Sequence, residues 1–136
     1  MRYRKLKGYK YQIVESESFN ISTEFDGLVA ETPYIILVNN CLLVKEGYAF
    51  DGPSGPTFDT KDFMRASLAH DAGYQLMREG LMDRSYRAAV DRVLRDLCLK
   101  DGMPRWRVWY IYRAVRLFAG GAVKPKKRIF NEIIEI

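Results

Sequence analysis

The residues most capable of chemistry lie between positions 47 and 75. This stretch, GYAFDGPSGPTFDTKDFMRASLAHDAGYQ, holds four aspartates and the only histidine of the chain. In a helix, His70 and Tyr74 are four residues apart and share a face, whereas Asp71 points about 100° away from His70. A single helix could therefore present a general base and a metal ligand side by side.

Asp91 is the best candidate to support that histidine. It lies beside an apolar stripe that contains Val90 and Leu94, where a carboxylate is costly unless it has a partner. If the helices that carry His70 and Asp91 pack antiparallel, as their short connection favours, Asp91 can reach both His70 and Tyr74. An aspartate bonded to one imidazole nitrogen fixes the tautomer and leaves the other nitrogen to accept a proton from water. We therefore predict that His70, Tyr74 and Asp91 form a catalytic group.

The loop DGPSGP, residues 51–56, precedes this helix. Gly52 and Gly55 permit tight backbone conformations, while Pro53 and Pro56 remove two amide donors and keep their carbonyl groups. A phosphate site needs converging N–H donors, but a hard cation such as Ca²⁺ prefers carbonyl and carboxylate oxygens. The loop suits Ca²⁺ better than phosphate. The alternative is an ordinary Pro/Gly turn that leaves a strand.

Each candidate side chain also has a purely structural interpretation. A single helical histidine is more often a structural residue than a catalyst, and Tyr74 could be an ordinary core aromatic. Basic partners are available for both carboxylates, namely Arg78 or Lys61 for Asp71 and Arg87 or Arg95 for Asp91. The functional interpretation gains weight only if the residues come together.

Strands are predicted for the first 50 residues. Short β-branched or aromatic runs occur at 9–14, 19–23, 34–38 and 41–50. Asp26-Gly27 and Asn39-Asn40 stand where turns are needed, and the second pair joins two apolar runs at hairpin spacing. We expect an antiparallel β-meander.

Three helices are predicted between 59 and 120, where the apolar period becomes about 3.6. The first begins at Asp59 or Thr60 and ends at Gly80, and the second has Asp83 as N-cap and ends at Gly102. The third has Pro104 in its first turn and Gly120-Gly121 as terminator. The apolar stripe of the second helix is Tyr86, Val90, Val93, Leu94 and Leu97. Strands followed by helices indicate an α+β fold.

Composition limits the classes of protein to consider. With 136 residues, 48% of them hydrophobic, the chain can bury one core, and we expect a single domain over 1–136. The net charge of +5 is a mild excess, and two cysteines favour a reducing compartment over a disulfide-built fold. No segment approaches the roughly 18 apolar residues of a membrane span, and no signal-peptide core is evident. We therefore expect a soluble protein without a transmembrane segment.

Several other chemistries lack their residues. One histidine is too few for an HD-type phosphohydrolase, GPSGPT lacks the lysine of a P-loop, and there is no Gly-x-Ser-x-Gly sequence. Cys41, Cys98 and His70 lack the close spacing of a zinc site. Nucleotide cofactors are not indicated.

The third helix and the tail are basic. The helix alternates arginines with aromatic residues and could lie against an anionic membrane; the alternative is a core helix whose arginines reach solvent. Its arginines are Arg105, Arg107, Arg113 and Arg116, among Trp106, Trp109, Tyr110 and Tyr112. The tail, 121–136, joins a basic cluster from Lys124 to Arg128 to an apolar run at 129–136, which could dock on another protein. Nucleic-acid binding is weaker, because the charge excess is modest and no known module appears.

The run from Gly47 to Gly80 resembles a family of unknown function that is frequent in tailed bacteriophages and prophages. The resemblance extends over most of the chain. The resemblance implies a phage gene whose product acts in the cytoplasm of the infected bacterium or as a part of the virion. It implies no activity.

The sequence HDAGY, residues 70–74, is similar to the His-Asp-x-x-Tyr motif of phospholipase A2, in which a glycine-rich calcium loop precedes the motif. This resemblance covers roughly residues 50–95. It implies that His70 activates water, that Asp71 binds Ca²⁺ with carbonyls near Gly52 and Gly55, and that Tyr74 and Asp91 support the histidine. Asp59 and Asp62 are not assigned, because the interval from Asp62 to His70 is about two residues too long, and two residues turn a helix by about 200°.

Two functions follow as hypotheses. The first is a phage-encoded, Ca²⁺-dependent ester hydrolase that acts on phospholipid or another ester. The second is a non-enzymatic phage protein of the virion, of tail assembly or of host interaction, in which the Asp-rich loop is structural.

Overall fold

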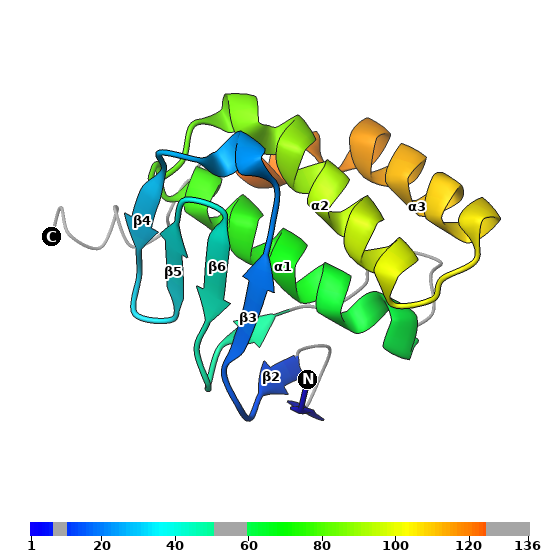
Figure 1. The fold of residues 1–136 in the computed structure, drawn as a ribbon, viewed down its shortest axis with the longest axis horizontal. Coiled ribbons are helices and arrows are strands. Elements are labelled where there is room, and N and C mark those ends of the chain that lie inside the picture. Colours follow the sequence, from blue (N-terminus) through cyan, green and yellow to red (C-terminus); the bar gives the residue numbers. More distant parts are fainter. Residues whose placement is uncertain (7–10, 51–59, 125–136) are drawn as a thin grey trace, which may run out of the picture.

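The computed structural model describes residues 1–6, 11–50 and 60–124. Antiparallel strands occupy the N-terminal half and three α-helices follow, so the predicted α+β fold is confirmed (Figure 1). The predictions made for Gly52, Gly55 and Asp59, and for 125–136 of the tail, lie outside the described residues.

The strands form two antiparallel sheets. The three-stranded sheet has the order β1-β2-β7, with β1 at Tyr3–Lys5, β2 at Tyr11–Ile13 and β7 at Ala49–Phe50. The four-stranded sheet has the order β3-β6-β5-β4, with β3 at Glu17–Asn20, β4 at Val29–Glu31, β5 at Ile35–Val38 and β6 at Cys41–Val44. Strands β4, β5 and β6 form a meander, and β3 pairs with the other edge of β6.

Turns end two of the predicted strands earlier than the sequence pattern indicated. The hairpin at Asn39 is confirmed, because Asn39 adopts a φ of 53° between β5 and β6. The predicted strand 41–50 is two strands: the chain turns after Val44 through Gly47, whose φ is +94°, and β7 joins the other sheet. The predicted strand 19–23 ends at Asn20, because the chain then enters a 3₁₀ turn, η1, at Thr23–Phe25. Strands β1 and β4 were not predicted.

The three predicted helices are present. They are α1 at Lys61–Arg78, α2 at Arg87–Lys100 and α3 at Arg105–Phe118. Gly80 and Gly102 follow α1 and α2, so the two predicted helix ends are confirmed; their φ values of +75° and +95° make both of them left-handed stops. Thr60 is the N-cap of α1, one of the two residues proposed for that place.

Two helix boundaries differ from the prediction. The Asp83 carboxylate accepts a hydrogen bond from Ser85 N, but it caps a 3₁₀ turn, η2, at Arg84–Tyr86, and α2 begins after it. Gly120 and Gly121 do not have the positive φ of a glycine terminator: α3 ends at Phe118, and the chain tightens into a 3₁₀ turn, η3, at Gly120–Val123.

The elements pack in layers (Figure 1). The four-stranded sheet lies against α1, and α1 packs against α2. Helix α3 packs against the side of α2 that faces away from α1. Gly73 allows the close approach of α1 and α2, because a Cβ atom there would lie only 2.8 Å from Cγ1 of Val90. The two helices are antiparallel, so residues near 70 on α1 face residues near 91 on α2.

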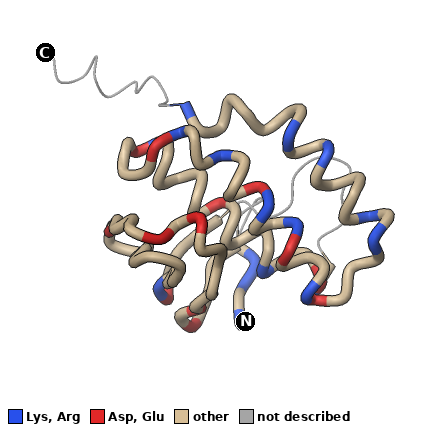
Figure 2. Tube along the Cα trace, turned by 45° about the horizontal axis from the view of Figure 1, so that its top comes forward, with Lys and Arg blue, Asp and Glu red and all other residues tan. Residues whose placement is uncertain are grey.

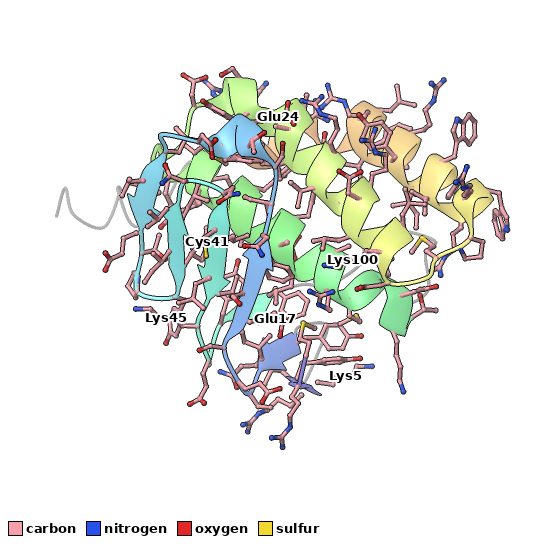
Figure 3. The ribbon with its side chains drawn as sticks, in the orientation of Figure 1. Lys5, Glu17, Glu24, Cys41, Lys45 and Lys100 are labelled. Carbon is pink, nitrogen blue, oxygen red and sulfur yellow. The ribbon has the colours of Figure 1, made fainter. Side chains whose placement is uncertain are left out.

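Two arginines connect the helices to the N-terminal half of the chain. Arg65 of α1 binds Glu17 of β3 at 3.1 Å and Asp101, just after α2, at 2.8 Å; Glu17 is labelled in Figure 3. Arg92 of α2 forms an ion pair with Glu24 of η1, also labelled there.

Candidate active site

His70, Tyr74 and Asp91 meet between α1 and α2. Nε2 of His70 lies 2.7 Å from Oδ1 of Asp91, and the hydroxyl of Tyr74 donates to the same oxygen at 2.5 Å. The imidazole and phenol rings lie side by side, with centroids 4.1 Å apart. All three side chains are buried, and Asp91 has no exposed surface. The meeting of Asp91 with His70 and Tyr74, expected if the two helices pack antiparallel, is therefore present.

Two arginines balance the charge of Asp91. Arg116, from the last turn of α3, donates from Nη1 to Oδ2 of Asp91 at 2.7 Å. Arg87 lies one turn before Asp91, with Nε 3.8 Å from Oδ2, and the same nitrogen donates to the Tyr74 hydroxyl at 3.1 Å. The other end of Arg87 donates to the carbonyls of Val115 and Arg116, both at 2.9 Å. The end of α3 is thus part of the site.

The ionisation of Asp91 follows from these contacts. Burial acts to raise the pKa of Asp91, but hydrogen bonds from His70, Tyr74 and Arg116 outweigh it and hold the pKa below its usual value. Burial, together with the hydrogen bond to Asp91 and its charge, raises the pKa of Tyr74. At neutral pH the site therefore contains a carboxylate and a neutral phenol.

The tautomer of His70 follows from the carboxylate. An ionised carboxylate oxygen only accepts hydrogen bonds, so Nε2 of His70 must carry the proton that points to Asp91. In a neutral imidazole, Nδ1 is then the nitrogen with the lone pair. Among the described residues we find no hydrogen-bond partner for Nδ1, and 10% of the side-chain surface is exposed. The contact of Nε2 with Asp91 thus fixes the orientation of the ring.

Asp71, the predicted calcium ligand, lies on α1 and is partly exposed. The expectation was that its carboxylate binds Ca²⁺ together with backbone carbonyls of the preceding loop. Gly52 and Gly55, expected to supply those carbonyls, lie outside the described residues. Within 1–6, 11–50 and 60–124, no three His, Cys, Asp or Glu side chains gather into a metal-binding group.

The structural alternatives have mixed outcomes. Arg87, proposed as a partner of Asp91 on its own helix, is near it, whereas Arg95 binds Asp96 at 3.1 Å instead. Arg78 donates to the carbonyl of Ala122 at 3.1 Å. The contact of Arg116 with Asp91 was not predicted. The sequence indicated this contact only indirectly. A buried aspartate needs a partner, and Arg116 lies next to the apolar side of α3 that packs into the fold.

The other residues considered for chemistry are apart from this site. Cys41 is exposed on β6, where Figure 3 labels it, and Cys98 is buried in α2.

The third helix is not a core helix throughout: Val108 and Ile111 are buried, but Trp106 and Trp109 are exposed. In the described part of the chain, each helix is too short or too polar to cross a bilayer.

Comparison with known proteins identifies no relative of this chain. The chain matches no family model, no curated protein and no solved structure. The assignment of a function therefore depends on the geometry of the site and on the residues that form it.

Proposed function

We propose that the protein is a Ca²⁺-dependent ester hydrolase in which His70 activates water, and that phospholipid is its substrate. The observation that supports this most is the 2.7 Å contact of His70 Nε2 with Asp91 Oδ1, made between two helices. It gives the imidazole a fixed orientation and a proton-accepting Nδ1, which are the properties of a general base.

The residues of the chain have distinct roles in this proposal. His70 takes a proton from water through Nδ1 as the water oxygen bonds to the ester carbonyl carbon, and the imidazolium later gives that proton to the leaving alkoxide. Asp91 and Tyr74 are positioning residues. Asp91 keeps Nε2 protonated and stabilises the imidazolium by its charge, and Tyr74 and Arg116 hold the carboxylate in place.

Calcium is part of the same proposal. Asp71, with the carbonyls of Gly52 and Gly55, would hold the ion, which when bound would polarise the ester carbonyl and stabilise the oxyanion. Support comes from the partly exposed carboxylate of Asp71 directly after His70 in the sequence of α1.

Hydrolysis of a dispersed short-chain phospholipid tests the role of His70 without requiring a bilayer. With millimolar Ca²⁺ we expect fatty-acid release that falls at least about a hundredfold in His70→Asn. Glu79→Gln, an exposed change beside the end of the same helix, is the matched control and should retain the wild-type rate. Release that is equal in His70→Asn and wild type, or no release from the folded wild type, would contradict the proposal.

Calcium binding is measured separately by calorimetry. The wild type should bind Ca²⁺ and Asp71→Asn should lose that binding while keeping the same circular dichroism spectrum. If wild type and Asp71→Asn give the same heat, Asp71 is not a ligand. If the folded wild type gives neither calcium heat nor lipid hydrolysis, the His70 cluster is structural, as the non-enzymatic alternative requires.

A further inference from the structure

The outward side of α3 exposes large apolar side chains. This α3 outer face consists of Trp106 (71% exposed), Trp109 (63%), Tyr110 (48%), Arg113 and Leu117 (72%), with Phe118 (82%) at its end. Tryptophan is among the more buried residue types on average, and folded monomers rarely expose large contiguous apolar patches. The exposure of this set therefore indicates an interaction surface.

Helical geometry makes the face continuous. Positions 106, 109, 110, 113 and 117 follow the spacing i, i+3, i+4, i+7 and i+11, so they lie in one stripe. Eleven residues of helix extend about 16 Å, so the stripe runs nearly the full length of α3. The opposite side carries Val108 and Ile111, which are buried, and α3 packs against α2. Helix α3 thus has two apolar sides, and one of them lacks a partner among the described residues.

The charge around the α3 outer face has one sign. Residues 102–131 contain no Asp or Glu, and Figure 2 shows basic but no acidic positions along α3. Arg107 and Arg116 are occupied within the fold, by Asp62 at 3.2 Å and Asp91 at 2.7 Å. Arg105 and Arg113 are exposed, and Arg113 lies over the Trp109 ring with its guanidinium carbon 5.3 Å from the centroid. The face combines apolar residues with positive charge.

We propose that the α3 outer face binds the surface of an anionic lipid bilayer. A helix with tryptophans and leucine on one side and arginines beside them suits the plane of the membrane interface, where apolar side chains enter the acyl boundary and cations meet anionic headgroups. The stripe runs parallel to the helix axis, so a helix lying flat on the bilayer brings Trp106 and Leu117 into the interface together.

Two other occupants fit less well. A second copy of the chain in a two-fold contact would bring Arg105 and Arg113 against the same residues, with no carboxylate on α3 to neutralise them. Single-stranded nucleic acid stacks on aromatic rings within a basic groove, but the α3 outer face is the side of a helix and ends in Leu117 and Phe118. The bilayer accounts for both the aliphatic and the basic residues.

Tryptophan fluorescence tests the proposal directly, because Trp106 and Trp109 are the only tryptophans of the chain. Adding vesicles that contain phosphatidylglycerol should shift the emission to the blue, and binding to pure phosphatidylcholine vesicles should be at least about tenfold weaker, since each arginine contributes about fivefold. The full chain is used with His70→Asn, so that lipid hydrolysis, which this inference does not require, cannot alter the vesicles.

Matched pairs of variants locate the contact. Leu117 and Val29 are equally exposed, at 72%, on α3 and on β4 respectively. Leu117→Asp should weaken vesicle binding at least about tenfold, whereas Val29→Asp should change it less than about twofold. Arg113→Glu should weaken it strongly, and Arg4→Glu, an exposed change on β1, should have little effect.

The results that overturn the proposal are distinct. No blue shift with phosphatidylglycerol vesicles, or equal binding by Leu117→Asp and Val29→Asp, excludes the α3 outer face as a membrane surface. Quenching by single-stranded DNA without any response to vesicles identifies a nucleic-acid surface instead, and sedimentation as a dimer that Leu117→Asp abolishes identifies a self-contact. Vesicle binding without hydrolysis by the wild type leaves this inference intact and contradicts only the proposed function.

Discussion

Asp91→Asn is the most informative single change for the packing of the site. The substitution keeps the shape of the side chain but removes the charge that accepts hydrogen bonds from His70, Tyr74 and Arg116. The amide nitrogen then brings two donors into a site that already consists of donors. Arg116 and Arg87 lose their common carboxylate.

The size of the effect follows from the burial of the partners. Removing one partner of a buried ion pair costs about 3–5 kcal/mol. The side chains of Arg116 and Arg87 keep 35% and 19% exposure, so their guanidinium groups can regain some water, and we expect the lower end, about 3 kcal/mol. With a urea dependence of about 2 kcal/mol/M, the unfolding midpoint should fall by about 1.5 M.

Urea unfolding, followed by circular dichroism, measures this difference. Asp96→Asn is the matched control, because Asp96 lies on the same helix, is 62% exposed in its side chain and pairs only with Arg95 among the described residues. It should change stability by less than about 1 kcal/mol. A fall of less than about 0.3 M for Asp91→Asn, or equal effects of the two substitutions, would refute the buried network.

The same pair of proteins gives a prediction for pH. Because the folded-state pKa of Asp91 is lowered, its contribution to stability is fully present above the unfolded value of about 3.9 and is lost as pH falls through the folded value. The advantage of wild type over Asp91→Asn should therefore be constant near neutral pH and shrink below about pH 4. An advantage that grows on acidification would contradict this assignment.

Two further predictions concern packing and thiol chemistry. Gly73→Ala places a methyl group 2.8 Å from Val90 and should destabilise the protein by about 1–3 kcal/mol in thermal unfolding. Gly121→Ala is the control: the space around Gly121 is open, so stability should change by less than about 0.5 kcal/mol. Equal effects would show that α1 and α2 are not in close contact at Gly73. Burial raises the pKa of Cys98 to about 12, so a thiol reagent should label only Cys41 in the folded protein and both cysteines in denaturant, and rapid labelling of both in the folded state would contradict the burial of Cys98.

The fold was predictable where the signal is local. The change from period two to period 3.6 located the three helices, and Gly80 and Gly102 marked two helix ends, because a left-handed stop depends on one residue and its neighbours. The short strands β1 and β4 were not predicted, because their residues, YRK and VAE, include charged side chains and form no run of β-branched or aromatic residues. The run 41–50 predicts one strand because both of its parts are apolar, but the chain turns after Val44 and the two parts join different sheets.

The candidate site was predictable to the extent that it depends on helical spacing. His70 and Tyr74 had to share a face of α1, and Asp91 had to find a partner because its neighbours are apolar. Arg116 was missed, since it reaches Asp91 from a helix whose position depends on the packing of α3 on α2.

The sequence by itself determined the helical periods, the left-handed glycine stops, and the placing of His70 and Tyr74 on one side of a helix. Only the tertiary structure decided which partners surround Asp91 and which side of α3 faces outward. The physical reason is one of range. Backbone and periodic preferences act over a few residues. Which of the two apolar sides of α3 is buried depends instead on the apolar area that α2 covers in the folded protein. In this structure the side that carries Trp106 and Trp109 stays exposed.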